Sequence, residues 1–343
     1  MPAGKHMTDE IEIQPEIFAN LLDARGEIAE VAAAVARRRP RFALLAARGS
    51  SDHAALYAKY LIEVLLQLPV GLASPSTTTL YGARPDLTDV LLISVSQSGG
   101  SPDLLAVTES GRAQGALTVA ITNTASSPLA EAAELSLDIR AGQERAVAAT
   151  KTYSATLLTL YLLVDAIRGG DGTHAEALPE LASTALSERT AVDEAVQRYR
   201  FADRMVTTGR GYSLATAQEA ALKLAETSYL SARSYSGADL LHGPVAAIDP
   251  ETAVLALTSN GRGGESIREV LDAVHERGAD VCAIGSAAPQ APAAHRVPVP
   301  DCAEELAPVL EVLPVQQLAL GLALARGFDP DAPRGLDKET KTR

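Results

Sequence analysis

The stretch SVSQSGGS at positions 94–101 places serines, a glutamine and two glycines directly after an apolar run. A second turn of this kind, ARGSS at positions 47–51, follows another apolar run. The backbone N–H groups, hydroxyls and positive helix-dipole end of such turns together suit a dianionic phosphate. A single turn is explained equally well by ordinary helix capping. Two in adjacent strand-helix units favour phosphate, so we expect a phosphate site in the first half of the chain.

A helix further along the chain carries charged residues on one face. Glu219, Lys223 and Glu226 are spaced by four and three residues, which brings them together on a helix. A positioned carboxylate of this kind can act as a general base that transfers a proton. Alone, however, the pattern is typical of a solvent-exposed face with an i,i+4 salt bridge. The spacing leaves both interpretations open.

The elements that must position these residues occur twice. Residues 41–51, 90–101 and 116–122 are echoed by 204–213, 253–265 and 279–285, at an offset near 162 or 163 residues. Short apolar strands alternating with helices predict a parallel sheet covered on both faces. We therefore expect an α/β fold made of two tandem domains, each a doubly wound five-stranded parallel α/β/α sandwich.

Ligands of such sheets bind beyond the carboxyl ends of the strands, where the strand order reverses. Gly49, Ser96 and Gly211 all follow predicted strands. The second-half turns at 210–213 and 259–264 lack the serine cluster, so we expect one phosphate site per chain.

The predicted segments are an N-terminal helical segment, a first domain, a connecting helix, a second domain and a tail or lid. Their ranges are 1–40, 41–170, 171–200, 201–327 and 328–343, with the connecting helix at about 174–199. Residues 1–6 lack the apolar core of a signal peptide and are interpreted as an extension ahead of Met7.

Composition restricts the possible partners. The 343 residues carry a formal charge of −13, which argues against nucleic acid or an anionic membrane as partner. Cys282 and Cys302 form no CxxC motif, which is typical of a reduced compartment and predicts a cytoplasmic protein. No apolar stretch is expected to be long enough to span a bilayer. The apolar run at 157–164 is broken by Asp165 and Arg168 and predicts a core helix.

The segments SVSQSGGS, ARGSS and AVAATKTY at 146–153 resemble the phosphosugar loops of sugar isomerase (SIS) domains. The chain is most similar to the isomerase half of glucosamine-6-phosphate synthase and its deaminase relatives. ALKLAETSYL at 221–230, GADLLHGPVAAI at 237–248 and DPDAPRGLDKET at 329–340 extend the resemblance over nearly the whole chain from Met7. It implies tandem SIS domains, a homodimer with its active site near the interface, a hexose 6-phosphate ligand, and no metal or cofactor.

The resemblance also implies roles for particular residues. Glu226 takes the position of the carboxylate that transfers the C2 proton, and Glu219 that of a supporting group. His242 would assist ring opening from across the dimer interface. Lys338 matches a lysine that closes over the open-chain sugar, assisting ring opening or forming a Schiff base, although a polar tail is otherwise typical of a frayed terminus. The implied phosphate and sugar contacts are Gly49, Ser50, Ser51, Ser96, Gln97, Ser98, Ser101, Ala148, Ala149, Thr150 and Lys151.

Some positions depart from the family. Gly100 and Ala225 replace an acidic and a basic residue of the synthase, and Asp337 and residues 339–343 differ from its closing segment. No amidotransferase half is recognisable, so we do not expect a glutamine-dependent synthase.

Two reactions remain open after proton abstraction from an amino-sugar 6-phosphate. Glucosamine 6-phosphate would be deaminated and isomerised to fructose 6-phosphate. On N-acetylglucosamine 6-phosphate the nitrogen is an amide, so loss of water across C2 and C3, with His242, Glu219 or another acid protonating the C3 hydroxyl, is the natural exit. The alternative is a non-catalytic phosphosugar sensor, which would have no use for Glu226, His242 and Lys338 together. We interpret the chain as an enzyme.

Overall fold

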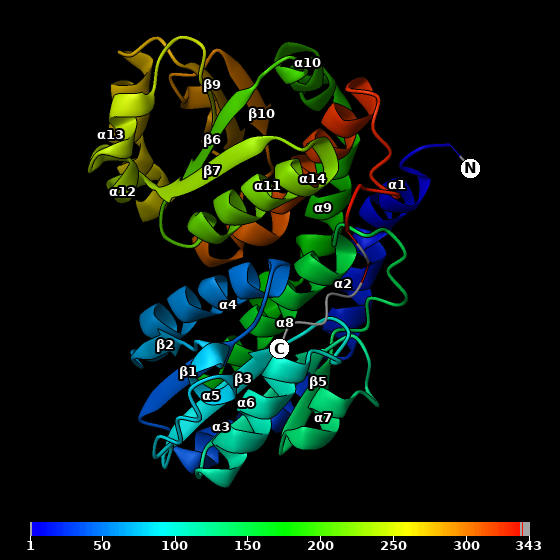
Figure 1. The fold of residues 1–343 in the computed structure, drawn as a ribbon, viewed down its shortest axis with the longest axis vertical. Coiled ribbons are helices and arrows are strands. Elements are labelled where there is room, and N and C mark those ends of the chain that lie inside the picture. The colour runs from blue at the N-terminus through cyan, green and yellow to red at the C-terminus, as the bar shows by residue number, and fades with distance from the viewer. Residues whose placement is uncertain (1, 337, 339–343) are drawn as a thin grey trace. The chain divides into compact units, whose positions relative to one another are not determined.

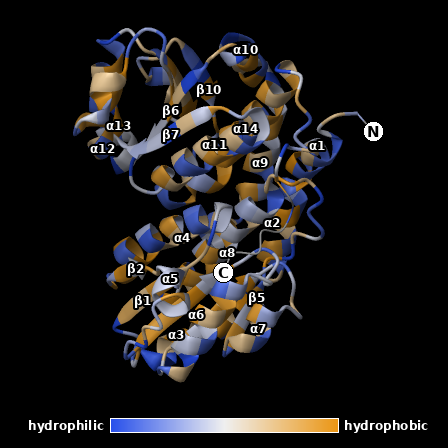
Figure 2. Ribbon diagram, viewed as in Figure 1, coloured by the Kyte–Doolittle hydropathy of each residue, from blue (hydrophilic) through white to orange (hydrophobic). Residues whose placement is uncertain are grey.

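The computed structural model describes residues 2–336 and Lys338 and divides into two compact units (Figure 1). The first-half unit comprises residues 16–143 and 151–176. The second-half unit comprises residues 2–15, 144–150 and 177–338. Helices in both units carry alternating hydrophilic and hydrophobic stripes (Figure 2), as expected of helices that cover a sheet with one face.

The first-half unit contains five parallel strands in the order β2-β1-β3-β4-β5. The strands are β1 (Phe42–Ala46), β2 (Val70–Leu72), β3 (Val90–Val95), β4 (Leu117–Thr122) and β5 (Leu135–Asp138). Strands β3 and β4 are buried at every position, which explains their continuous apolar sequence.

Two groups of helices cover this sheet. Helix α8 contacts both α3 and α4, and α6 contacts both α5 and α7. The bounds are α2 (Gln14–Asp23), α3 (Arg25–Arg38), α4 (Ser50–Leu61), the π-helical turn η1 (Ile62–Leu66), α5 (Pro75–Thr79), α6 (Pro102–Ala113), α7 (Pro128–Ala132), α8 (Lys151–Ile167) and η2 (Thr173–Ala175).

The second-half unit contains five parallel strands in the order β10-β9-β8-β6-β7. The strands are β6 (Arg204–Gly209), β7 (Ser231–Ser236), β8 (Ala253–Leu257), β9 (Asp280–Gly285) and β10 (His295–Pro298). Its helices are α1 (Lys5–Glu12), α9 (Leu178–Ser187), α10 (Arg189–Tyr199), α11 (Ser213–Ser228), α12 (Gly237–Leu241), η3 (Pro244–Ala247), α13 (Arg262–His275), η4 (Ala288–Gln290), η5 (Glu304–Leu306) and α14 (Ala307–Ala325).

The two sheets have the same topology. Read in chain order within each half, both follow the pattern second-first-third-fourth-fifth. Strands β6, β8 and β9 begin 162, 163 and 163 residues after β1, β3 and β4. The predicted tandem of doubly wound five-stranded α/β sandwiches is therefore confirmed.

Two expectations about the helices are wrong. The first is that no segment is long enough to span a bilayer. Glu304–Ala325 is long and apolar enough, but 94% of its most apolar window is buried inside the protein. It includes the core helix α14, and burial within a folded unit explains its composition equally well.

The second concerns the single connecting helix expected at about 174–199. The structure contains α9 and α10, separated at Glu188, whose ψ of 60° is not helical. The Leu186 carbonyl, which would accept a hydrogen bond within a continuous helix, instead accepts one from Gln317 Nε2 at 3.0 Å. This buried partner on α14 takes the place of the intrahelical bond.

The segment interpreted as an extension ahead of Met7 contributes to the start of a helix. Helix α1 begins at Lys5. The backbone N–H of Gly4 donates to Asp329 Oδ1 at 2.9 Å, and that of His6 donates to Asp331 Oδ2 at 2.7 Å. The two aspartates thus satisfy N–H groups at the start of α1 that have no intrahelical acceptor.

Candidate functional site

The two serine-bearing turns follow neighbouring strands of the first-half sheet. Strands β1 and β3 pair in parallel, from Phe42 opposite Val90 to Ala46 opposite Ser94. The chain order reverses between them, because β2 lies beyond β1 and β4 lies beyond β3. This reversal is where doubly wound sheets bind ligands. The turns at 47–51 and 96–101 therefore lie where this sheet is best suited to bind an anion.

The first turn leads directly into α4. Gly49 has a φ of +57° and is the N-cap, so Ser50 and Ser51 are the first two residues of the helix. Their backbone N–H groups have no intrahelical acceptor and point out of the helix start. Glycine provides the left-handed backbone conformation that this tight entry requires.

The second turn arranges hydroxyls around backbone amides. The N–H of Gly99 donates to Ser96 Oγ and that of Gly100 to Ser98 Oγ, both at 3.2 Å. Ser101 is the N-cap of α6, and its side chain does not cap the helix. The cluster thus combines serine hydroxyls with the start of a helix, as an anion site needs.

Neighbouring segments fix the shape of this turn. The Gln97 carbonyl accepts a hydrogen bond from the Asn123 N–H at 3.0 Å. Gly99 has a φ of +64°, and a Cβ there would lie only 2.2 Å from Ser127 Oγ. Only glycine fits at this position.

An ion pair that the sequence did not suggest joins the two turns. Arg48 Nε donates to Asp103 Oδ2 at 2.9 Å. Arg48 belongs to the first turn, whereas Asp103 follows the second turn and is only 2% exposed. The burial of Asp103 next to the second turn would have indicated this ion pair, but burial cannot be read from the sequence.

The charged face of α11 belongs to the second-half unit and is not solvent-exposed. The side chains of Glu219 and Lys223 are 0% and 1% exposed, whereas that of Glu226 is 24% exposed. Lys223 Nζ lies 3.4 Å from Glu219 Oε1 and donates a short hydrogen bond to Glu226 Oε2. The interpretation of the stripe as a solvated surface is therefore wrong, and its shared face is confirmed.

Electrostatics keep Lys223 charged despite its burial. Burial alone lowers the pKa of the Lys223 ammonium. The carboxylates of Glu219, Glu226 and Glu144 outweigh this effect and hold the pKa above its ordinary value. The buried ammonium of Lys223 thus pairs with Glu226, the more exposed of the two carboxylates on this face.

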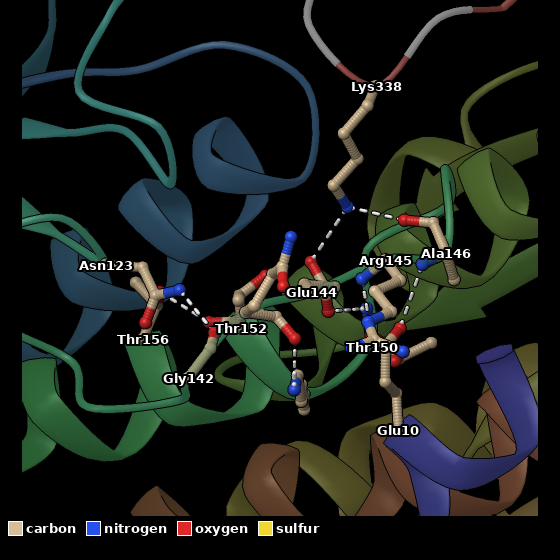
Figure 3. A network of polar contacts seen from close by, with 12 residues as sticks. Glu10, Asn123, Gly142, Glu144, Arg145, Ala146, Thr150, Thr152, Thr156 and Lys338 are labelled. Atoms are coloured by element: carbon tan, nitrogen blue, oxygen red, sulfur yellow. Dashed lines mark hydrogen bonds and ion pairs between the residues drawn. The ribbon is translucent and has the colours of Figure 1, made fainter.

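Lys338 contacts the segment 144–150. Its Nζ donates to Glu144 Oε2 at 3.2 Å and to the Ala146 carbonyl (Figure 3). Glu144 is fully buried and also accepts the Thr150 N–H at 2.8 Å. Because Glu144 also acts on the pKa of Lys223, one buried carboxylate connects Lys338 electrostatically to the α11 stripe.

Two further contacts hold the segment 144–150 in place. Glu10 on α1 accepts hydrogen bonds from the N–H groups of Arg145 and Ala146 (Figure 3). Gln316 on α14 donates to the Thr150 carbonyl at 3.1 Å. Neither Glu10 nor Glu144 stands out in the sequence, because their partners are more than a hundred residues away or are backbone groups.

The other predicted residues differ in their surroundings. Ala148 and Thr150 are buried, and Ala149 is partly exposed, so their expected contact with a sugar stays a prediction. His242 ends α12 and is exposed. Within residues 2–336 and Lys338, no hydrogen bond or ion pair joins its side chain to Glu219, Lys223 or Glu226. Of the positions that depart from the family, Asp337 and residues 339–343 lie outside the described residues.

Comparison with known proteins shows the same duplication. The SIS domain family model matches residues 38–166 and 199–326. The chain is 33% identical, over 97% of its length, to an isomerizing glutamine–fructose-6-phosphate aminotransferase of Pseudomonas aeruginosa, of which it spans 58%. It thus spans little more than half the length of the curated relatives it matches.

Solved structures show the same fold over nearly the whole chain. A crystal structure from Silicibacter pomeroyi DSS-3, provisionally assigned as a phosphosugar isomerase, is 36% identical. It superposes with a TM-score of 0.87 over 95% of this chain and 99% of that one. A glucosamine-6-phosphate deaminase from Thermotoga maritima, 23% identical, shares the fold with a TM-score of 0.81 over 98% of this chain and 99% of that one.

Proposed function

The chain belongs to the SIS domain family, and on this basis we propose that it acts on an amino-sugar 6-phosphate by abstracting the C2 proton of the open-chain sugar. The observation that carries the proposal is the buried Lys223 between two carboxylates. Glu219 is fully buried and neutralises the lysine, whereas Glu226 is partly exposed and can reach a substrate. Glu226 is therefore the general base.

The serine-bearing turns of the first-half unit provide the phosphate site in this proposal. The hydroxyls and helix-start amides of these turns suit a dianion. Arg48, which belongs to the first turn, contributes a guanidinium. The amine of Lys338, held by Glu144, assists ring opening. The proposal also keeps His242 as a ring-opening group supplied by the second chain of a cytoplasmic homodimer.

The substituent on the C2 nitrogen decides the fate of the carbanion formed by proton abstraction. With a free amine, the enolamine is protonated at C1 and the resulting imine is hydrolysed by water, which releases ammonia and leaves a ketone at C2. With an acetamido group, the electron pair left at C2 expels the protonated C3 hydroxyl as water and forms a C2–C3 double bond. Each route balances without an oxidant or cofactor.

Purified protein incubated with each phosphosugar separates the two routes. Ammonia from glucosamine 6-phosphate supports deamination, and an ultraviolet-absorbing enal from N-acetylglucosamine 6-phosphate supports dehydration. In D₂O, deuterium is expected to enter C2 of recovered substrate. If neither product forms and no deuterium enters, the proposed function is wrong.

The role of Glu226 has a matched control. We expect Glu226→Gln to lower turnover by roughly 10²–10⁴-fold and to abolish deuterium entry. Glu276→Gln makes the same change at an exposed position of the second-half unit and should leave both unchanged. Phosphosugar binding without turnover, equal in wild type and Glu226→Gln, would instead identify a sensor.

The proposal that His242 acts in the active site of the partner chain has its own test. Glu226→Gln and His242→Ala chains are each expected to be inactive. When the two are mixed and allowed to exchange subunits, a dimer with sites shared across the interface regains one intact site. Dimers that form but recover no activity would show that His242 does not act in the partner's site.

A further inference from the structure

A cavity of about 460 Å³ lies at the amino-terminal edge of the second-half sheet and is called the edge cavity below. Its walls come from the start of β9, from the segments before β8 and β10, and from the ends of α10 and α13. Its volume is within the range of sites that bind small molecules, roughly 300–1,000 Å³. The apolar part of the wall consists of Pro250, Pro292, Ala293 and Ala294.

The charged side chains that line the edge cavity are mostly cationic. Arg198, His275 and Arg296 line it, and the acidic lining in the described part of the chain is Asp280 alone. Arg198 Nε donates to both carboxylate oxygens of Asp280, at 2.9 and 2.8 Å, and the Tyr199 hydroxyl donates to Oδ1 at 3.2 Å. One guanidinium therefore already matches the carboxylate, which leaves a second guanidinium and an imidazole in excess.

Arg296 is held in place without a carboxylate partner. Its Nε donates to the Ala291 carbonyl at 3.1 Å, which fixes the side chain and leaves the two terminal nitrogens for another acceptor. Among the residues that the structure describes, no carboxylate pairs with Arg296 or with His275. A guanidinium oriented in this way can bind two phosphate oxygens at once.

The first-half sheet has a cavity at the same edge, but without an excess of cations. Strand β4 starts at Leu117, 163 residues before Asp280, and the cavity there measures about 260 Å³. Its charged lining is one guanidinium, Arg38, and one carboxylate, Asp89, and Arg38 also lies 3.9 Å from Glu134. A cavity at this edge is thus a feature of the fold, whereas the cationic lining is specific to the second half.

We propose that the edge cavity is a binding site for a small phosphorylated molecule. Arg296 and His275 donate to its phosphate oxygens, and the proline and alanine wall packs against the rest of the molecule. A dianion matches two donors that lack an acidic partner in a chain whose net charge is −13. The site differs in construction from the serine-bearing turns, and the inference does not rest on the proposed catalytic function.

Isothermal titration calorimetry with pyrophosphate tests the proposal. We expect Arg296→Gln to weaken one pyrophosphate-binding event per chain by at least about tenfold relative to wild type. His275→Gln keeps the guanidinium and should weaken the same event by roughly threefold or more. Pyrophosphate bound in the first-half unit is common to all three proteins, so the difference between them reports the edge cavity.

Arg277→Gln is the matched control. Arg277 is exposed and lies two residues after His275, but it does not line the cavity. Its Nη1 donates to the Ala273 carbonyl at 2.7 Å, so the substitution removes an equal charge and a similar backbone contact. The control should bind pyrophosphate as wild type does. An equal loss in the control would assign the effect to net charge and overturn the proposal.

The simpler alternative is that these cations only solvate the surface and complement the carboxyl end of α13. Equal pyrophosphate affinity and stoichiometry in wild type, Arg296→Gln and His275→Gln would establish that alternative. If Arg296→Gln does not fold, His275→Gln decides the question, because His275 is exposed at the end of α13 and can be replaced without disturbing the core. Unchanged binding in that folded variant overturns the proposal.

Discussion

Replacing Glu311 by glutamine is predicted to stabilise the protein at alkaline pH. Glu311 lies on α14 and is 1% exposed. Burial raises the pKa of its carboxyl group to about 8, with Glu304 nearby adding to the rise and the neighbouring Ser213 opposing it. The folded protein therefore holds a proton on Glu311 that the unfolded chain releases.

The sign and size of the effect are set by these pKa values. Below the ordinary pKa of 4.5, both states are protonated and the contribution of Glu311 to stability is complete. Between 4.5 and about 8, the native state binds more protons than the unfolded state, so stability falls as pH rises. At roughly 1.4 kcal/mol per pH unit, the loss amounts to at most about 5 kcal/mol. Glutamine is neutral throughout and avoids this loss.

Urea unfolding of wild type and Glu311→Gln at several pH values tests the prediction. The free energies of unfolding should agree within about 1 kcal/mol near pH 5, and the variant should be more stable by about 1–5 kcal/mol near pH 8.5. Glu276→Gln, at an exposed position, is the control and should match wild type at both values. A Glu311→Gln protein whose stability declines with pH as steeply as that of wild type would refute the reasoning.

Three further predictions concern the candidate site. Lys223→Met leaves buried carboxylates without their cation, so the free energy of unfolding measured in urea should fall by about 3–5 kcal/mol. Glu144→Gln removes the charge 3.2 Å from Lys338 Nζ and should lower turnover about tenfold, measured by steady-state kinetics. Gly99→Ala should weaken phosphosugar binding at least tenfold by calorimetry, since its Cβ would meet a side chain at 2.2 Å.

Each of these variants has a control. Lys59→Met removes the lysine of a more exposed i,i+4 pair and should lower the free energy of unfolding by no more than about 1 kcal/mol. Glu12→Gln is exposed and should keep full turnover. Gly100→Ala adds a Cβ whose nearest neighbour is 3.7 Å away, so binding should persist. Wild-type stability of Lys223→Met, full turnover in Glu144→Gln, or equal affinities of the Gly99 and Gly100 variants would contradict the respective prediction.

The sequence alone was sufficient for the fold and for the turns. Strands and the turns after them are local features, with apolar runs that end in glycine and serine, and a duplication at a constant offset shows them twice. The face shared by Glu219, Lys223 and Glu226 is also local, because helical spacing determines it. These parts of the prediction depended only on residues close together in the chain.

Burial and long-range partners were decided by the tertiary structure. The spacing of the charged residues on α11 is typical of a solvated surface, and only the structure shows that this face is buried. The role of Glu144 likewise becomes evident only from its proximity to Lys338 and Lys223 in the fold. Arg48 pairs with Asp103, and Glu304 reaches the amides of α13, only because parallel strands distant in sequence end at the same edge of a sheet. Desolvation and ion pairing depend on such neighbours, and they determine which of many charged residues carry altered chemistry.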